Sequence, residues 1–317
     1  MRRFRARRKR LAALALLPIA ALTATTTMAV TAGAAGTAEI ETSKRSVRFG
    51  GGLTLRGTFS GAENAPVEIQ HRAKGGAWQE VRGTQTDANG AYSVRVKPRR
   101  TGDWRALLAT APDPLATDGD STILATSPHA ETRAARVAVR SRTRANVGGR
   151  HLTVGRAAKI KGRVLPGGRG RKVTVKVGSR SIETRTDRDG SFAGRWRGRS
   201  TGSYKVRVKA AGNRVASGSR DFAGRVTVYR PASASWYGPG LYGNPTACGG
   251  TLTPSTLGVA HKTMRCGTRL RLRYRGRTVS VRVIDRGPFA GNREFDLTAA
   301  TKERLGFGST GTVLSSK

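Results

Sequence analysis

The chain has few acidic residues, few aromatic residues and only two cysteines. Its 317 residues include 19 Asp and Glu against 59 Lys and Arg, which gives a formal net charge of +40. Aromatic residues make up 6%, whereas glycine is abundant, at 41 residues. This composition favours several small β-rich domains over one large core. The charge predicts anionic partners, such as nucleic acid, acidic lipid or acidic wall polymer.

An apolar run near the N-terminus predicts export. Leu11–Leu22 follows a segment with seven positive charges and precedes the small residues Ala32-Gly33-Ala34. This layout predicts a cleaved signal peptide over residues 1–34. The alternative is a retained anchor, but a membrane span needs roughly 20 apolar residues, and Pro18 shortens the run. We therefore expect a secreted or cell-wall protein with no stable membrane span, which argues against nucleic acid as its partner.

The two cysteines, Cys248 and Cys266, lie close together in the C-terminal part of the chain. In an exported protein, such a pair predicts a disulfide, worth roughly 3 kcal/mol in the chain-entropy model. A zinc site would need more ligands, and His261 is the only further candidate nearby. We expect no metal ion and no cofactor.

The middle of the chain contains an internal repeat. Residues 86–92 match residues 186–192, and residues 99–104 match residues 199–204, both at an offset of 100. Two copies of one module are therefore expected, with boundaries near residues 35, 142 and 230.

Each copy of the module is predicted to be β. Val67–Gln70 and Val173–Val177 alternate apolar and polar residues, and Gly90 and Gly190 supply turns. About seven short strands in each copy predict two immunoglobulin-like β-sandwiches, over residues 35–141 and 142–230. The aromatic residues after the turns are expected in the cores, with sugar stacking as the weaker alternative.

Neither repeat carries a catalytic motif. Paired acids, a Ser-His-Asp order and a Gly-rich phosphate loop are all missing. The first interpretation is a spacer or wall-adhesion module, and the second is a module for teichoic acid or another anionic wall polymer. An insert over residues 111–129 holds Asp113, Asp118 and Asp120, which favour a solvated loop over a calcium site.

The C-terminal part, residues 231–317, carries several motifs in order. They are Ala234–Gly238 (ASWYG), Ala260–Thr263 (AHKT), an alternating strand that ends in Asp285–Phe289 (DRGPF), and Phe295–Thr298 (FDLT) before a short helix over 299–305. Together these motifs resemble the rare lipoprotein A (RlpA) family. The resemblance implies a six-stranded double-psi β-barrel with a surface groove that acts on peptidoglycan glycan strands. Expansins share the same barrel. The family's enzymes are lytic transglycosylases.

The residues themselves also favour a site here. Val279, Val281 and Val283 face the core in a predicted strand, so Asp285 is expected at the barrel rim. Asp296 lies between apolar residues at the start of the helix. A transglycosylase needs one group that acts first as acid and then as base. We assign that role to Asp285, with support from His261 and Asp296.

Substrate binding is assigned to Trp236, Tyr237 and Arg286. The catalytic and binding candidates also have structural interpretations. Asp296 can cap the helix, Asp285 can pair with Arg286 or bond to turn amides, and His261 can be a hydrogen-bonded core histidine. Trp236 and Tyr237 can be core residues.

One position departs from the family pattern. Relatives commonly have a proposed active-site Glu two residues after the position of Cys248, and this chain has Gly250 there. The sequence therefore leaves three hypotheses: a lytic transglycosylase, an expansin-like module that binds or loosens wall glycan without cutting it, and an adhesin dominated by its repeats. We expect the first, acting as a monomer on peptidoglycan glycan strands.

Overall fold

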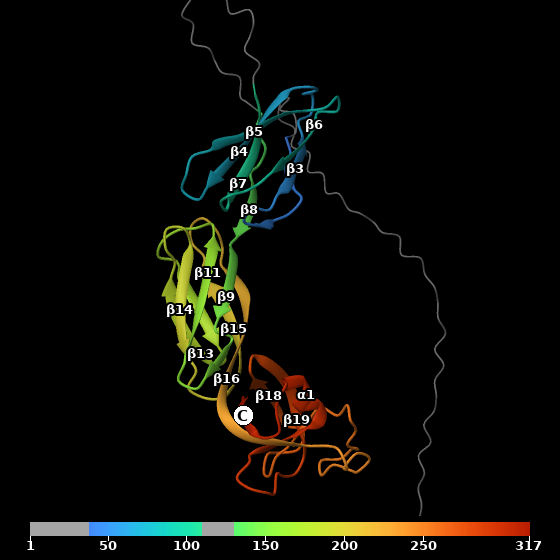
Figure 1. The fold of residues 1–317 in the computed structure, drawn as a ribbon. Helices are drawn as coiled ribbons and strands as arrows, with labels where there is room; N and C mark the ends of the chain where they lie inside the picture. Colours follow the sequence, from blue (N-terminus) through green and yellow to red (C-terminus); the bar gives the residue numbers. More distant parts are fainter. Residues whose placement is uncertain (1–37, 110–129) are drawn as a thin grey trace, which may run out of the picture. The chain divides into compact units, whose positions relative to one another are not determined.

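The computed structural model describes residues 38–109 and 130–317 (Figure 1). The predicted signal peptide lies outside these residues, as does the insert with Asp113, Asp118 and Asp120. Within the described ranges the chain is almost entirely β, with one α-helix. That helix is too short to cross a membrane. The predicted all-β class is confirmed.

The first repeat folds into two sheets that share one hydrophobic core. The smaller sheet has the order β1 (Glu41–Thr42), β3 (Leu53–Thr58), β6 (Ala91–Val96). The larger has the order β2 (Ser46–Arg48), β8 (Ala135–Arg140), β7 (Gly102–Leu108), β4 (Pro66–Ala73), β5 (Gln79–Gln85). Leu55 of the smaller sheet and Ile69 and Trp104 of the larger are fully buried in that core.

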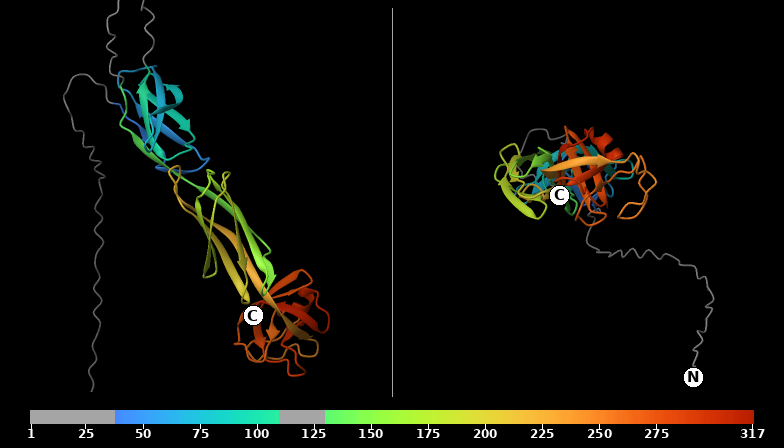
Figure 2. Two further views of the ribbon diagram at one scale, coloured as in Figure 1. Left: turned by 90° about the vertical axis from the view of Figure 1, so that its left-hand side faces the viewer. Right: turned by 60° about the horizontal axis from the view of Figure 1, so that its bottom comes forward.

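The second repeat is also built from two sheets. One has the order β14 (Ser191–Arg197), β11 (Ala157–Leu165), β9 (Arg142–Gly148). The other has the order β13 (Arg180–Arg185), β12 (Lys172–Val177), β15 (Gly202–Ala210), β16 (Ser219–Tyr237), and β10 (His151–Thr153) pairs with β16. Figure 2 shows the strands of this unit in two layers. Phe192 is buried in its core and Tyr204 packs against that core, as expected.

The repeated residues adopt the same local structure in both copies. Thr86 and Thr186 are buried, and each side-chain oxygen accepts a hydrogen bond from a backbone N–H, of Ala65 and Arg171 respectively. The turn glycines Gly90 and Gly190 both have positive φ, of 71° and 84°. The sequence repeat is therefore a repeat of structure at these turns.

The C-terminal domain contains six strands and the helix. They are the end of β16, β17 (Val259–Ala260), β18 (Arg269–Tyr274), β19 (Arg277–Asp285), β20 (Phe295–Thr298), α1 (Ala299–Leu305) and β21 (Gly311–Ser315). The pairing order is β16-β20-β17-β19-β18-β21, and β21 also pairs with β16. Val279, Val281 and Val283 face the core as predicted. β16 continues without a break through the predicted boundary at residue 230, so the change in composition at Pro231 does not end the strand.

Candidate active site

Asp285 and Asp296 lie in one row across the C-terminal sheet. β17 runs between β19 and β20, and its Ala260 pairs with Asp285 on one side and with Asp296 on the other. Neighbouring strands are about 4.8 Å apart, so the two Cα atoms are about 10 Å apart. Ser235 of β16 continues the row beside Asp296. Four strands thus bring together residues that are far apart in the sequence.

A β-bulge brings Asp285 onto this face of the sheet. Along β19 the alternation Val279, Val281, Val283 would place Asp285 on the core side. The pairing with β17 shifts at Ile284, because Val259 pairs with Val283 and the next residue, Ala260, pairs with Asp285. Such a bulge re-aims the residues that follow it. Asp285 therefore shares the face of Asp296, which alternates with the core residues of β20.

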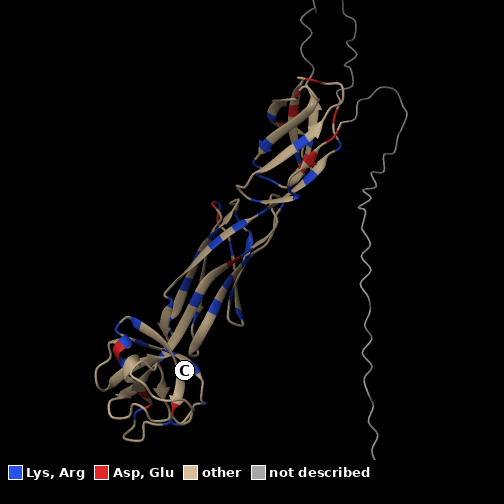
Figure 3. Ribbon diagram, turned by 90° about the vertical axis from the view of Figure 1, so that its right-hand side faces the viewer, with Lys and Arg blue, Asp and Glu red and all other residues tan. Residues whose placement is uncertain are grey.

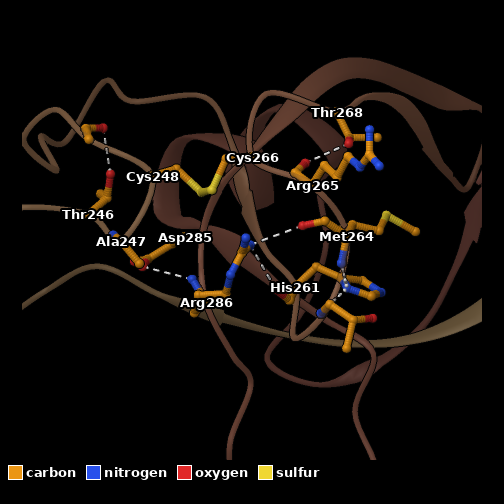
Figure 4. The surroundings of a disulfide bond; sticks show 12 residues. Thr246, Ala247, Cys248, His261, Met264, Arg265, Cys266, Thr268, Asp285 and Arg286 are labelled. Carbon is orange, nitrogen blue, oxygen red and sulfur yellow. Dashed lines mark hydrogen bonds between the residues drawn. A yellow bond between two sulfur atoms is a disulfide. The ribbon is translucent and has the colours of Figure 1, made fainter.

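The Asp285 carboxylate is held by one of its oxygens (Figure 4). Oδ1 accepts hydrogen bonds from the backbone N–H of Ala247, at 2.9 Å, and of Arg286, at 2.8 Å. One of the two structural roles considered for Asp285, a hydrogen bond to turn amides, is therefore present. It fixes the position of the carboxylate. The side chain of Tyr237 also interacts with the Asp285 carboxylate.

The predicted disulfide between Cys248 and Cys266 is present and lies beside Asp285. The Cys248 N–H donates to the Ile284 carbonyl at 3.1 Å, and the Gly267 N–H donates to the Val283 carbonyl at 2.8 Å. The bridge thus joins two loops that both bond to the end of β19. It anchors the loop whose Ala247 N–H bonds to Asp285.

Tyr237 lies on the same face as both carboxylates. Its register on β16 places it two residues beyond Ser235, next to Thr298 of β20. The hydroxyl oxygen is buried and, among the described residues, has no partner at hydrogen-bonding geometry. Burial raises the pKa of Tyr237 far above its usual range, and the charge of Asp285, a side-chain interaction with Asp285 and the charge of Asp296 raise it further. The phenol is therefore a protonated group beside the two acids.

Asp296 is not the N-cap of α1, so that interpretation was wrong. The cap is Thr298, whose side-chain oxygen accepts from the Thr301 N–H. Asp296 belongs to β20 and accepts a hydrogen bond of 2.5 Å from the Ser235 hydroxyl. Its carboxylate lies on the face that Asp285 and Tyr237 share, where its charge acts on Tyr237.

His261 is held as a neutral side chain. Its Nδ1 accepts hydrogen bonds from the N–H groups of Thr263, at 3.1 Å, and Met264, at 3.0 Å, which assigns the ring proton to Nε2. The ring packs on Phe295. Burial lowers the pKa of His261; nearby Glu294 acts in the opposite sense, and Arg230 and Arg286 lower it further. These contacts match the hydrogen-bonded histidine of the structural interpretation.

Glu294 is a polar neighbour of His261 for which no role was predicted. Both its carboxylate oxygens accept from the Arg230 guanidinium, one at 2.7 Å, and its Oε1 lies 3.8 Å from His261 Nε2. The sequence carries no signal for this contact, because Arg230 lies 64 residues earlier and in a different predicted domain.

Arg286 and Trp236 both contact other parts of the protein. Arg286 Nη1 donates to the Met264 carbonyl at 3.0 Å and to the His261 carbonyl at 3.4 Å, so it supports the histidine turn. Trp236 packs against the C-terminal core, and the Lys302 ammonium lies 4.0 Å from the centre of its ring. A role for either residue in substrate binding stays a prediction.

Two further features lie near the site. Phe289, at the end of the DRGPF motif, is 82% exposed, and the sequence analysis did not single it out. Gly250 has φ +84° and faces open space. A side chain there would be strained, because this backbone region disfavours residues with a Cβ. In this loop conformation, the Glu of the family pattern could be placed only with strain.

The described residues include no group of three or more His, Cys, Asp or Glu that could hold a metal ion. The face carries two carboxylates, a phenol and backbone donors.

Comparison with known proteins identifies this domain. Residues 230–314 match the lytic transglycolase family. The matched region is a double-psi β-barrel domain, as predicted. Among curated proteins, the endolytic peptidoglycan transglycosylase RlpA of Campylobacter jejuni is 42% identical over 82 residues, which cover 25% of this chain and 30% of that protein. The probable RlpA of Synechocystis is 40% identical over 93 residues, 29% of each chain.

The family match is confined to residues 230–314. The chain spans only 24–30% of the length of the RlpA proteins of Synechocystis, Campylobacter jejuni and Pseudomonas aeruginosa. Solved structures give weak likenesses. A calcium-stabilised ice-binding adhesin from an Antarctic bacterium has a TM-score of 0.24 at 15% identity, with 84% of this chain and 73% of that chain covered. The ICAM-5 D1–D4 fragment has a TM-score of 0.33 at 13% identity, with 78% and 75% covered.

Proposed function

We propose that the C-terminal domain cleaves peptidoglycan glycan strands as an RlpA-like lytic transglycosylase. The observation that carries the proposal is the Asp285 carboxylate, which two backbone N–H groups fix through Oδ1, on the face that it shares with Asp296. The match of residues 230–314 to the lytic transglycolase family supports it.

In the proposed reaction, Asp285 acts first as acid and then as base. Its carboxyl proton passes to the glycosidic oxygen while the bond from that oxygen to C1 of the muramoyl residue breaks. The 6-hydroxyl of the same residue then attacks C1, and its proton returns to Asp285. The product is a 1,6-anhydro ring. No water is consumed, so the carboxylate spacing expected of hydrolases does not apply.

The other residues have supporting roles in this scheme. His261 and Arg286 are positioning residues, because they hold the turn next to Asp285. Asp296 and Tyr237 supply the polar surroundings of the acid. The exposed ring of Phe289 offers apolar surface for sugar rings.

The rest of the chain is assigned by the same proposal. Residues 1–34 are a signal peptide and the protein acts as a monomer in the cell wall. The two repeats, with boundaries near 35, 142 and 230, are immunoglobulin-like sandwiches, because each has two sheets over one core. The C-terminal strands β16 to β21 make the six-stranded double-psi barrel, an assignment that their pairing order supports.

A second function, binding of wall glycan without cleavage, is favoured by one observation. Gly250 occupies the position of the family's Glu, and its φ of +84° disfavours any side chain there. An expansin-like module would need a glycan-binding surface but not a second acid.

The identity of the products separates the two functions. The full chain is incubated with intact and peptide-stripped peptidoglycan, and soluble products are analysed by mass spectrometry. Muropeptides with 1,6-anhydro ends establish the transglycosylase. Glycan that is bound but not cut establishes the binding module, and reducing ends without anhydro rings contradict both.

A further inference from the structure

The positive charge of the chain is concentrated in the second repeat. Residues 142–230 contain 24 Lys and Arg against four Asp and Glu. Residues 35–141 contain 15 against 11. Two copies of one module thus differ sharply in charge, although their cores and turns are alike. Figure 3 shows Lys and Arg along the strands of the second unit.

One face of the larger sheet in this repeat gathers cations around a groove. On β12 and β15 the buried valines alternate with exposed Lys176, Arg207 and Lys209, so these side chains point away from the core. Lys176 pairs with Arg207 across the sheet, and Lys209 pairs with Arg220 of β16. The groove has a volume of about 500 Å³, and its lining includes all four cations.

These four cations have no acidic partner. In the described part of the chain none of them forms an ion pair or a side-chain hydrogen bond. Glu183 on the neighbouring strand pairs with Lys172. Asp221 also lines the groove, but its carboxylate accepts from the Ala145 N–H of the other sheet at 2.7 Å. Their charge is therefore available to a ligand.

The first repeat provides the comparison within the same chain. Acids occupy its corresponding face, where Asp103 pairs with Arg72 and Arg136. In the second repeat Ser203 stands at the position of Asp103. The neutral Leu107 of the first repeat is replaced by Arg207. The same sheet face thus carries paired charges in one copy and unpaired cations in the other.

An aromatic ring lies among these cations. Phe222 is 58% exposed, lines the groove and pairs in register with Arg207. The register of β15 and β16 shifts at this point, which leaves Ala223 as the extra residue of a bulge. An exposed ring of this size is a stacking surface for a sugar ring.

We propose that this cationic groove, formed by Lys176, Arg207, Lys209, Arg220 and Phe222, binds a linear anionic polysaccharide. Cations two residues apart on a strand are about 7 Å apart, and those on neighbouring strands about 5 Å apart, so a charged chain meets a regular array. Phe222 contacts a sugar ring while the cations contact carboxylate or phosphate groups. This binding is independent of the reaction proposed for the C-terminal domain.

Binding of the full chain to polygalacturonate tests the proposal. We expect the variant Lys176→Gln/Arg207→Gln/Lys209→Gln/Arg220→Gln to bind at least about tenfold more weakly, with a shallower dependence on salt concentration, because fewer counterions are displaced. Phe222→Ser should weaken binding several-fold at all salt concentrations. Neutral pullulan should not bind measurably.

The matched control removes the same charge from the other sheet of the same repeat. Lys159, Lys161, Arg195 and Arg197 are exposed on β11 and β14, and their replacement by Gln should leave the affinity within about twofold of the wild type. Equal weakening in both quadruple variants would show that net charge alone drives binding and would overturn the proposal. So would an unchanged affinity in Phe222→Ser, or equally tight binding of an oligonucleotide of the same charge.

Discussion

Asp285 accepts a hydrogen bond from the backbone N–H of Ala247, 38 residues earlier in the chain, at 2.9 Å. Ala247 precedes Cys248, which is bridged to Cys266. The disulfide is therefore connected to the proposed acid by one residue of backbone.

Replacing both Cys248 and Cys266 by Ser should lower both stability and activity. The bridge closes a loop with a sequence separation of 18 residues. Closing a loop of this size is worth about 3 kcal/mol in the chain-entropy model. We expect the free energy of unfolding to fall by about that amount, and turnover to fall because Ala247 is less firmly held. Chemical denaturation and product formation measure both. Full turnover in a destabilised variant would show that the bridge does not position the site.

Tyr237→Phe should separate stability from function. The buried hydroxyl has no partner at full hydrogen-bonding geometry among the described residues, and an unsatisfied group of this kind costs about 1–3 kcal/mol. Its removal should leave the free energy of unfolding unchanged or raise it. Turnover should fall, because the phenol is the protonated group beside Asp285 and Asp296. A loss of stability with unchanged turnover would assign Tyr237 to packing alone.

His261→Asn and His261→Ala should differ. The Asn side-chain oxygen can accept the bonds that Nδ1 accepts from Thr263 and Met264, whereas Ala cannot. We expect the Asn variant to keep most of the turnover and stability, and the Ala variant to lose both. Equal loss of turnover in two stable variants would instead make His261 a direct participant.

The same histidine predicts a dependence of stability on pH. Because the pKa of His261 is lowered in the folded state, the unfolded chain binds the proton more readily. Stability is therefore lost as pH falls below about 6.5, the ordinary value for histidine. Denaturation at pH 7.5 and at pH 5.5 should show a smaller loss in His261→Asn than in the wild type. Identical losses would contradict the assignment.

Thr298→Ala should destabilise the domain by about 1 kcal/mol or more, because an N-cap is lost. Thr298→Ser keeps the capping oxygen and serves as control. Asp296→Asn should change stability little, since Asp296 does not cap α1. Thermal unfolding compares the three variants, and a larger loss in Asp296→Asn would restore Asp296 as a structural residue.

Much of the structure of the C-terminal domain can be predicted from local patterns in the sequence. The alternation of Val279, Val281 and Val283 predicts strand β19 and its core face, and α1 has the predicted bounds, Ala299–Leu305. The disulfide follows from the proximity of two cysteines in an exported chain. These features depend on residues that are neighbours in the sequence.

The arrangement of the site depends on strand pairing instead. The bulge at Ile284 turns Asp285 onto the face of Asp296, and it exists only because β17 pairs with β19. The contacts between Arg230 and Glu294 and between Ser235 and Asp296 join residues more than 60 positions apart. Neither the apolar–polar periodicity of the sequence nor its composition carries information about such contacts.

The most direct test of the central claim is the rate at which full-length Asp285→Asn releases 1,6-anhydro muropeptides from peptide-stripped peptidoglycan. Glu303→Gln, an exposed carboxylate on α1 of the same domain, is the matched control. We expect Asp285→Asn to be slower by about 10²-fold or more, with glycan binding and unfolding midpoint preserved, and the control to match the wild type. Wild-type turnover in Asp285→Asn would contradict the assignment of the acid/base to Asp285.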